Sequence, residues 1–182
     1  VNETIESVIW ISDLRSFTRM SDEFAPPVML GILNDHFERV VGAIADHGGE
    51  VLKFMGDSVL AIFPVDPGLG PQPAVDAAIK AVRDATTRIE KGNAARREKG
   101  LVEIGFGIAL HHGNVVYGNI GAPDRLDFTV IGPAVNQTAR IEALCRTLSR
   151  PVLVSQRIAD AAQSELVSLG FQALRGVREP QE

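Results

Sequence analysis

The run Ser7-Val-Ile-Trp-Ile-Ser12 constrains the fold of this chain more than any other segment. It is short, rich in β-branched and aromatic residues, and followed by a polar cluster, a combination that is typical of a buried strand. The first residue after the run is Asp13. The sequence therefore predicts a buried strand over Ser7–Ser12 that carries an aspartate at its end.

The next segments alternate between the helical and the strand period. Pro26 and Pro27 suit the first turn of a helix, and apolar residues then recur at helical spacing until Gly48-Gly49. Two apolar segments, Glu50–Met55 and Ser58–Phe63, flank Gly56-Asp57 and predict a tight hairpin. Further along we expect an exposed loop at Pro64–Pro73, a helix at Ala74–Lys99, strands at Glu103–Leu110 and Asp127–Ile131, a helix over about Pro133–Leu148, a strand at Pro151–Val154, a helix at Gln156–Ala162 and weak edge strands through Leu166–Leu174 and Gly176.

This order interleaves strands and helices without strict βαβ repetition. It favours an α+β fold in which helices cover one face of a mostly antiparallel sheet. A length of 182 residues is that of one compact domain, so we expect residues 1–182 to form a single domain. The chain starts at Val1 without an initiator methionine or a signal-peptide pattern, which we interpret as a domain excised from a longer protein.

Composition excludes several classes of function. A net charge of −5 disfavours a general nucleic-acid binder, so an anionic ligand must be held by local charges. The longest apolar runs, such as Val59–Phe63, are far shorter than the ~20 residues of a membrane helix, and we expect no membrane contact. The single cysteine, Cys145, forms no intrachain disulfide, which fits a reducing, cytoplasmic location, and we expect it to be a small buried hydrophobe.

Two aspartates occupy positions where chemistry is expected. Asp13 ends a buried strand and Asp57 occupies a hairpin tip, so the two carboxylates converge if those strands are neighbours. Mg²⁺ prefers one or two carboxylates together with substrate phosphates and water. The alternative is that both aspartates only fill turn positions, because aspartate is common in turns for its local hydrogen bonds. Spacing alone leaves both interpretations open.

Three blocks around these residues resemble motifs of the class III nucleotidyl cyclases. They are Trp10-Ile-Ser-Asp-Leu-Arg-Ser-Phe-Thr18, Gly48-Gly-Glu-Val-Leu-Lys-Phe-Met-Gly-Asp57 and Asp127-Phe-Thr-Val-Ile-Gly-Pro-Ala-Val-Asn-Gln-Thr-Ala-Arg140, with a matching glycine pattern at Gly113, Gly118 and Gly121. The blocks occur in the family's order, and the resemblance spans about residues 7–179. One departure is Ser16, which replaces a motif glycine in a loop expected to pass close to the phosphates.

The resemblance implies a ferredoxin-like α+β sandwich and an adenylate cyclase that converts ATP to 3′,5′-cyclic AMP and pyrophosphate. Asp13 and Asp57 match the ligands of two Mg²⁺ or Mn²⁺ ions, and the backbone carbonyl of Leu14 would be a further ligand. Asn136 would orient the ribose, and Arg140, four residues later on the same helix face, would neutralise the transferring phosphoryl group. It also implies a head-to-tail homodimer with shared active sites, and regulatory domains outside this chain.

Lys53 and Thr129 match the pair that reads the purine edge. A lysine can donate to adenine N1 and a threonine hydroxyl can accept from the 6-amino group, whereas guanine presents an acceptor O6 and a donor N1–H. The pair therefore favours ATP, and Thr129 in place of an aspartate is typical of the threonine-type subgroup. Arg125 and Arg175 are both candidates for contacting the triphosphate.

Other readings compete with this one. A catalytically silent dimerisation module of the same fold would be favoured if one matched position were missing, and none is. A guanylate cyclase is a further alternative. A GGDEF-type cyclase is disfavoured because Val51 follows Gly48-Gly49-Glu50. Adjacent histidines His111 and His112 would face opposite sides of a strand, which argues against a chelating pair.

Overall fold

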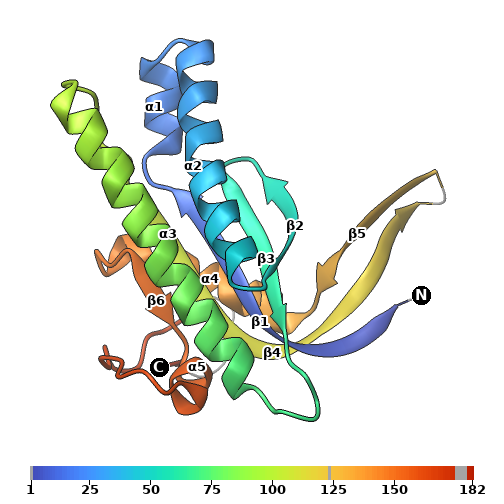
Figure 1. The fold of residues 1–182 in the computed structure, drawn as a ribbon. Helices are drawn as coiled ribbons and strands as arrows, with labels where there is room; N and C mark the ends of the chain where they lie inside the picture. Colours follow the sequence, from blue (N-terminus) through green and yellow to red (C-terminus); the bar gives the residue numbers. More distant parts are fainter. Residues whose placement is uncertain (1, 123, 175–179) are drawn as a thin grey trace.

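A computed structural model describes residues 2–122, 124–174 and 180–182 of the chain (Figure 1). The elements along the chain are β1 (Glu3–Leu14), α1 (Phe17–Glu23), α2 (Pro26–Asp46), β2 (Glu50–Met55), β3 (Ser58–Pro64), α3 (Gln72–Glu98), β4 (Phe106–Ala122), β5 (Arg125–Ile131), α4 (Pro133–Thr147), β6 (Val152–Val154) and α5 (Gln156–Ala161). The predicted α+β class is confirmed. None of the described helices is both long and apolar enough to cross a membrane.

The sheet has the strand order β2-β3-β1-β4-β5, and neighbours on this path are antiparallel. Strand β6 runs parallel to β4 beside Ile108–Leu110. The predicted strand at Ser7–Ser12 lies at the centre of β1, which pairs with β3 on one side and with β4 along its full length on the other. The chain therefore places Asp13 at the end of the middle strand of the sheet.

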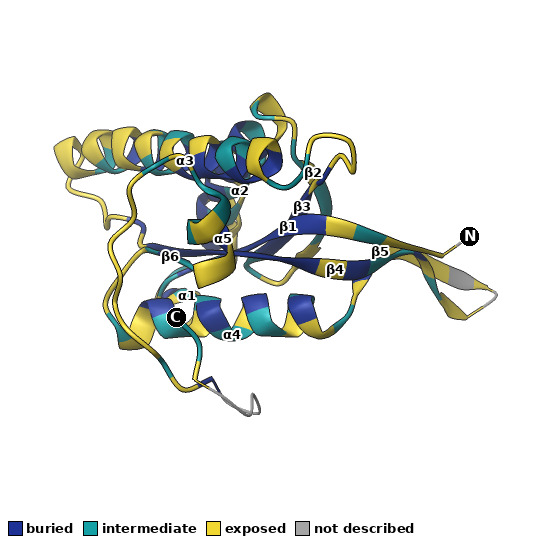
Figure 2. Ribbon diagram, turned by 90° about the horizontal axis from the view of Figure 1, so that it is seen from below, coloured by how far each residue is buried: buried dark blue, intermediate teal, exposed yellow. Residues whose placement is uncertain are grey.

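Both faces of β1 are buried. Because successive side chains of a strand point to opposite faces, Val8 and Trp10 belong to the core beneath α2 and α3, whereas Ile9 and Ile11 belong to the core on the other face. Figure 2 shows α2 and α3 on one side of the sheet and α4 on the other. The expectation that helices cover only one face was therefore wrong. Unbroken burial from Ser7 to Ser12 is the pattern of a strand covered on both sides.

Strand β4 is longer than its predicted range. The sequence predicts a strand at Glu103–Leu110, but β4 begins at Phe106 and continues through Gly113 to Ala122. A Cβ at Gly113 would lie 2.8 Å from the Cβ of Ala134, so the glycine permits close packing of α4 against the strand. Gly113 therefore marks a close approach between a strand and a helix and does not end the strand.

Two further expectations differ from the structure. Helix α1 (Phe17–Glu23) was not predicted, because seven residues are too few to show a helical period. The edge strands expected over Leu166–Leu174 do not form, and Gln172 only makes an isolated antiparallel bridge with Gln181. Gly176, the end of that expected segment, lies outside the described residues.

Helix α2 carries a buried histidine, His36, on its packed face. His36 is 2% exposed, and neither of its ring nitrogens has a hydrogen-bond partner among the described residues. Burial lowers the pKa of His36 to about 4; Asp35 opposes this effect and Arg39 adds to it. The folded state therefore holds the neutral imidazole at pH values where the unfolded chain is already protonated.

We predict that the free energy of unfolding decreases as the pH falls from 6.5 toward 4, by up to about 3 kcal/mol from His36. The sign follows because only the unfolded state takes up this proton within that window. In His36→Leu the slope against pH should be shallower, as measured by urea unfolding at pH 7.0 and pH 4.5. Parallel slopes for the variant and the wild type would contradict this assignment.

Candidate active site

The two candidate metal-binding aspartates lie next to each other. Strand β1 pairs with β3 up to Ser12↔Val59, so the end of β1 reaches the two-residue turn Gly56-Asp57 that joins β2 to β3. The Leu14 N–H donates to Oδ2 of Asp57 at 3.2 Å. The predicted hairpin and the convergence of its tip with the end of β1 are thus confirmed. The interpretation of Asp57 as only a turn residue does not account for its bond to a different strand.

A third carboxyl, Glu142 of α4, forms a hydrogen bond with Asp13. Burial, followed by this bond, raises the pKa of Glu142 to about 8. Burial also raises the pKa of Asp13, an effect that the Glu142 bond opposes. Burial therefore favours a protonated form of this carboxyl pair. The sequence analysis missed this residue, and only its position two residues after Arg140 hinted at a site role.

The donor set at this turn suits a hard cation. Among the described residues there is no group of three His, Cys, Asp or Glu side chains that could hold a metal ion. This end of β1 instead offers the carboxylates of Asp13 and Asp57, the second of which lies at the main chain of Leu14. Mg²⁺ and Mn²⁺ prefer oxygen donors, and Mg²⁺ usually takes only one or two carboxylates and completes its shell with phosphates and water. The residues therefore fit a cation that is shared with a phosphorylated substrate.

Lys53 and Thr129 come from opposite edges of the sheet, β2 and β5. The sheet curls so that these edges approach: Lys53 Nζ donates to Oδ2 of Asp127 at 3.2 Å, and the Tyr117 hydroxyl donates to Oε1 of Glu50 at 2.7 Å. Figure 1 shows the β4–β5 hairpin bending toward the side of β2. Asp127 and Thr129 share one face of β5 because they are two residues apart. The ammonium of Lys53 therefore lies on the Thr129 side of β5.

Thr129 has an unsatisfied hydroxyl. The residue is 3% exposed, and its Oγ1 has no hydrogen-bond partner among the described residues. A buried polar atom without a partner is rare and costs roughly 1–3 kcal/mol. This atom is therefore a candidate ligand contact. Asp127, which holds Lys53, is a second residue that the sequence analysis did not single out.

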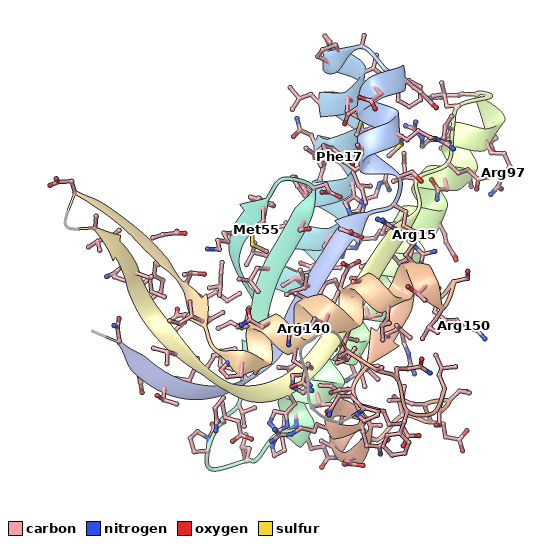
Figure 3. All side chains as sticks on the ribbon, turned by 180° about the vertical axis from the view of Figure 1, so that it is seen from behind. Arg15, Phe17, Met55, Arg97, Arg140 and Arg150 are labelled. Carbon is pink, nitrogen blue, oxygen red and sulfur yellow. The ribbon has the colours of Figure 1, made fainter. Side chains whose placement is uncertain are left out.

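Helix α4 carries Asn136 and Arg140. Pro133 occupies its first turn after Gly132, which has a φ of 142°, a value that favours glycine. Asn136 is exposed and Arg140 is partly exposed, and neither forms a hydrogen bond or ion pair with Asp13 or Asp57 among the described residues. Figure 3 shows Arg140 near the middle of α4 and Arg15 beyond the end of β1. The two groups are thus not joined directly within this chain.

The remaining predicted residues have different outcomes. Arg125 is the first residue of β5, but its side chain lies outside the described part, and Arg175 lies outside the described residues altogether. His111 pairs with the Ser155 hydroxyl at 2.7 Å and His112 with Glu6 at 2.6 Å. The two histidines thus have separate hydrogen-bond partners on different elements. Cys145 is buried, which confirms its interpretation as a core residue.

Comparison with known proteins identifies the class to which this fold and site belong. Residues 2–181 match the family described as the adenylate and guanylate cyclase catalytic domain. The chain is 33% identical over 159 residues to an adenylate cyclase of Anabaena cylindrica, covering 85% of this chain and 30% of that protein. It is 34% identical over 151 residues to adenylate cyclase 2 of Rhizobium meliloti, covering 82% of this chain and 40% of that protein.

Solved structures agree with this class. The structure of the guanylyl cyclase Cya2 superposes with a TM-score of 0.84 at 28% identity, covering 99% of this chain and 90% of that one. The adenylyl cyclase CyaB from P. aeruginosa has the same fold, with a TM-score of 0.87 at 23% identity, covering 100% of this chain and 93% of that one. The chain therefore belongs to the adenylate and guanylate cyclase catalytic domain family. It spans less than half the length of the two curated relatives named above.

Gly107 of β4 provides a test of the carboxyl cluster. A Cβ there would lie 2.6 Å from Oε1 of Glu142 and 3.3 Å from Oδ1 of Asp13. The Cβ of Cys145 in α4 would also lie 3.3 Å away. We predict that Gly107→Ala displaces the Glu142 carboxyl and crowds Asp13, reducing cyclase turnover about 10-fold or more, and that it costs about 1–3 kcal/mol of stability, because the buried Cys145 Cβ must also give way. Turnover and thermal unfolding are measured on the same samples.

The matched control is Gly31→Ala in α2, where an added Cβ meets nothing within 4 Å. It should keep full turnover and gain about 0.5–1 kcal/mol of stability. Full turnover in Gly107→Ala would show that the positions of the carboxyls are not critical.

Proposed function

We propose that this domain is an adenylate cyclase, which converts ATP to 3′,5′-cyclic AMP and pyrophosphate. The observation that carries the proposal is the position of Lys53 beside β5, on the face of the unsatisfied Thr129 hydroxyl. The ammonium can donate to adenine N1, and the hydroxyl can accept from the 6-amino group. Relatives named adenylate cyclases support the same substrate. The likeness to the guanylyl cyclase Cya2 keeps GTP as the second candidate.

Asp13 and Asp57, with the Leu14 carbonyl, would hold two Mg²⁺ or Mn²⁺ ions. When bound, the cations supply activation of the ribose 3′-hydroxyl and charge neutralisation at the triphosphate. The Leu14 N–H bond to Asp57 fixes the second carboxylate toward the end of β1. The 3′-oxygen forms a bond to the α-phosphorus, the bond from that phosphorus to the pyrophosphate oxygen breaks, and the 3′-hydroxyl proton is released. The chain needs no nucleophile of its own.

Asn136 and Arg140 would act on the substrate from α4. Both lie on one face of the helix because they are four residues apart. We assign Asn136 to the ribose and Arg140 to the charge that develops on the transferring phosphoryl group, where a fixed cation lowers the barrier. Arg125 and Arg175 remain candidates for contacts with the triphosphate. The reaction then depends mainly on positioning and on charge neutralisation.

We also propose that two copies form a head-to-tail homodimer with two shared sites. Asp13 and Asp57 of one copy would face Lys53, Thr129, Asn136 and Arg140 of the other. This is supported by large exposed apolar side chains on β2 and β5, the strands that carry Lys53 and Thr129: Phe54, Met55, Leu126, Phe128 and Ile131. Several large apolar side chains exposed on the same strands are typical of a surface that binds another protein. We further propose that this domain is part of a longer protein whose regulatory domains lie outside the present chain. The catalytic domain would be located in the cytoplasm, where ATP is available.

The choice of base is tested by Lys53→Glu combined with Thr129→Cys. The double variant should use ATP less well and gain some use of GTP, because the donor and acceptor pattern is exchanged and a buried mismatch costs about 1–3 kcal/mol. Products from each nucleotide with Mg²⁺ or Mn²⁺ are separated by chromatography. An unchanged ratio of ATP to GTP use would mean that these residues do not read the base. A wild type that makes only cyclic GMP would overturn the proposed substrate.

Shared sites are tested by mixing two inactive variants. Asp57→Asn and Arg140→Ala should each be inactive alone, because both sites of each homodimer carry the lesion. In a mixed dimer one site carries both lesions. The other site takes its aspartates from the Arg140→Ala chain and its arginine from the Asp57→Asn chain, so it is intact. Half of the dimers are mixed after random exchange and each has one good site of two, so roughly a quarter of wild-type activity should return. No recovery, with subunit exchange confirmed by labelled chains, would place the metals and the arginine in the same chain.

A further inference from the structure

Arg15 lies in the turn that follows β1, two residues after Asp13 and next to Leu14. We call the last two residues of β1 together with this two-residue turn the Asp13–Ser16 turn, and it contains the carboxylate and the carbonyl that would hold the cations. Ser16 has a φ of 60°, in the left-handed region, and among the described residues no side-chain hydrogen bond caps the start of α1. A non-glycine residue in that conformation is held there by its surroundings. The conformation of this turn therefore depends on contacts with residues of other segments of the chain.

The guanidinium of Arg15 supplies such contacts. Its Nη2 donates to the carbonyl of Cys145 at 3.0 Å and also to the carbonyl of Arg150. Both carbonyls belong to the C-terminal end of α4 and the turn after it, where Ser149 is left-handed and the Arg150 N–H also bonds to Cys145. The last carbonyls of a helix lack partners within the helix and carry the negative end of its dipole. An arginine is well suited to this position.

The main chain and the stem of Arg15 are also fixed. Its N–H donates to the carbonyl of Gly105 at 2.9 Å, just before β4. A Cβ at Gly105 would lie 3.1 Å from the Cβ of Arg15, so the glycine leaves space for the stem to pass. Figure 3 shows Arg15 at the end of β1, on the side of the end of α4 where Arg150 lies. The residue thus connects three segments that are far apart in the sequence.

We propose that Arg15 is a positioning residue for the cation site, which fastens the Asp13–Ser16 turn to the C-terminal end of α4. The proposal rests on the proposed function, in which Asp13, Leu14 and Asp57 hold the cations. The guanidinium is bonded to main-chain carbonyls at the end of α4, so we assign Arg15 to positioning the turn and not to contact with the cations or the substrate. Its role is to keep the Leu14 carbonyl and the Asp13 carboxylate where a small cation can use both. Groups that orient the ligands of a metal typically change its affinity by 10–100-fold when removed.

The test compares Arg15→Met and Arg15→Lys with the control Arg97→Met. Methionine keeps an unbranched stem and removes both bonds, while lysine keeps a charge but lacks the planar fork of donors. Arg97 lies at the end of α3 and pairs with Glu103 on the surface, so its loss removes an arginine whose side chain bonds to no residue of the turn among the described residues. Binding of Mn²⁺ is followed by electron paramagnetic resonance, with and without 3′-deoxy-ATP, which lacks the attacking hydroxyl. Turnover, KM and thermal unfolding are measured in parallel.

We expect Arg15→Met to bind Mn²⁺ roughly 10-fold more weakly and to lower kcat more than it changes the KM for ATP. The Mn²⁺ affinity and kcat of Arg15→Lys should lie between those of Arg15→Met and the wild type. Both quantities should be unchanged in Arg97→Met. Wild-type Mn²⁺ affinity in a folded Arg15→Met would overturn the proposal, even if its thermal midpoint is lower. If Arg15→Met does not fold, Arg15→Lys decides by the same measurement, since unchanged Mn²⁺ affinity there would also overturn it.

Asp57→Asn in the same experiment separates this proposal from the proposed function. Loss of Mn²⁺ binding in Asp57→Asn with wild-type binding in Arg15→Met would reject only the role of Arg15. Wild-type Mn²⁺ binding in Asp57→Asn would reject the cation site itself.

Discussion

The pairing of β1 with β3 on one side and β4 on the other fixes the positions of the two candidate metal-binding aspartates, and the other parts of the site are arranged around them. It brings the end of β1 to the turn between β2 and β3, where the Leu14 N–H meets the Asp57 carboxylate. The same strand is buried on both faces, and each fully buried large side chain contributes about 1.5–3 kcal/mol. A slip of one residue would exchange the two faces and move Asp13 away from Asp57. Stability of the core and geometry of the site therefore depend on one register.

Helix α4 has two roles that follow from its place on the second face of the sheet. It packs through Ile141 and Cys145 against the β4–β6 pair, which holds it close to β1. From there Glu142 reaches Asp13, and the C-terminal end of the helix receives Arg15. The glycines Gly107 and Gly113 make this approach possible, because a Cβ at either position would meet a group on α4. The helix that presents Asn136 and Arg140 is thus packed against the turn that presents the aspartates.

The curl of the sheet explains the second part of the site. In a flat sheet, β2 and β5 would be separated by the three strands between them, and Lys53 could not reach Asp127. Strand twist accumulates across a sheet, and the long β4–β5 hairpin bends so that the edges approach. The Lys53–Asp127 and Tyr117–Glu50 bonds form across this approach. They hold the lysine near Thr129 although each residue belongs to a different edge.

The sequence by itself determined the elements whose signal is local. The apolar run before Asp13, the turn at Gly56-Asp57 and the helix after Pro133 all formed as predicted, because short-range sterics and hydrophobic period set them. The three motif blocks also indicated the cyclase family correctly. Only the tertiary structure decided that α4 covers the second face, that Glu142 meets Asp13, and that Lys53 is held by Asp127. These contacts join residues far apart in the chain, and they depend on strand order, sheet curl and the space left by glycines, none of which a local pattern encodes.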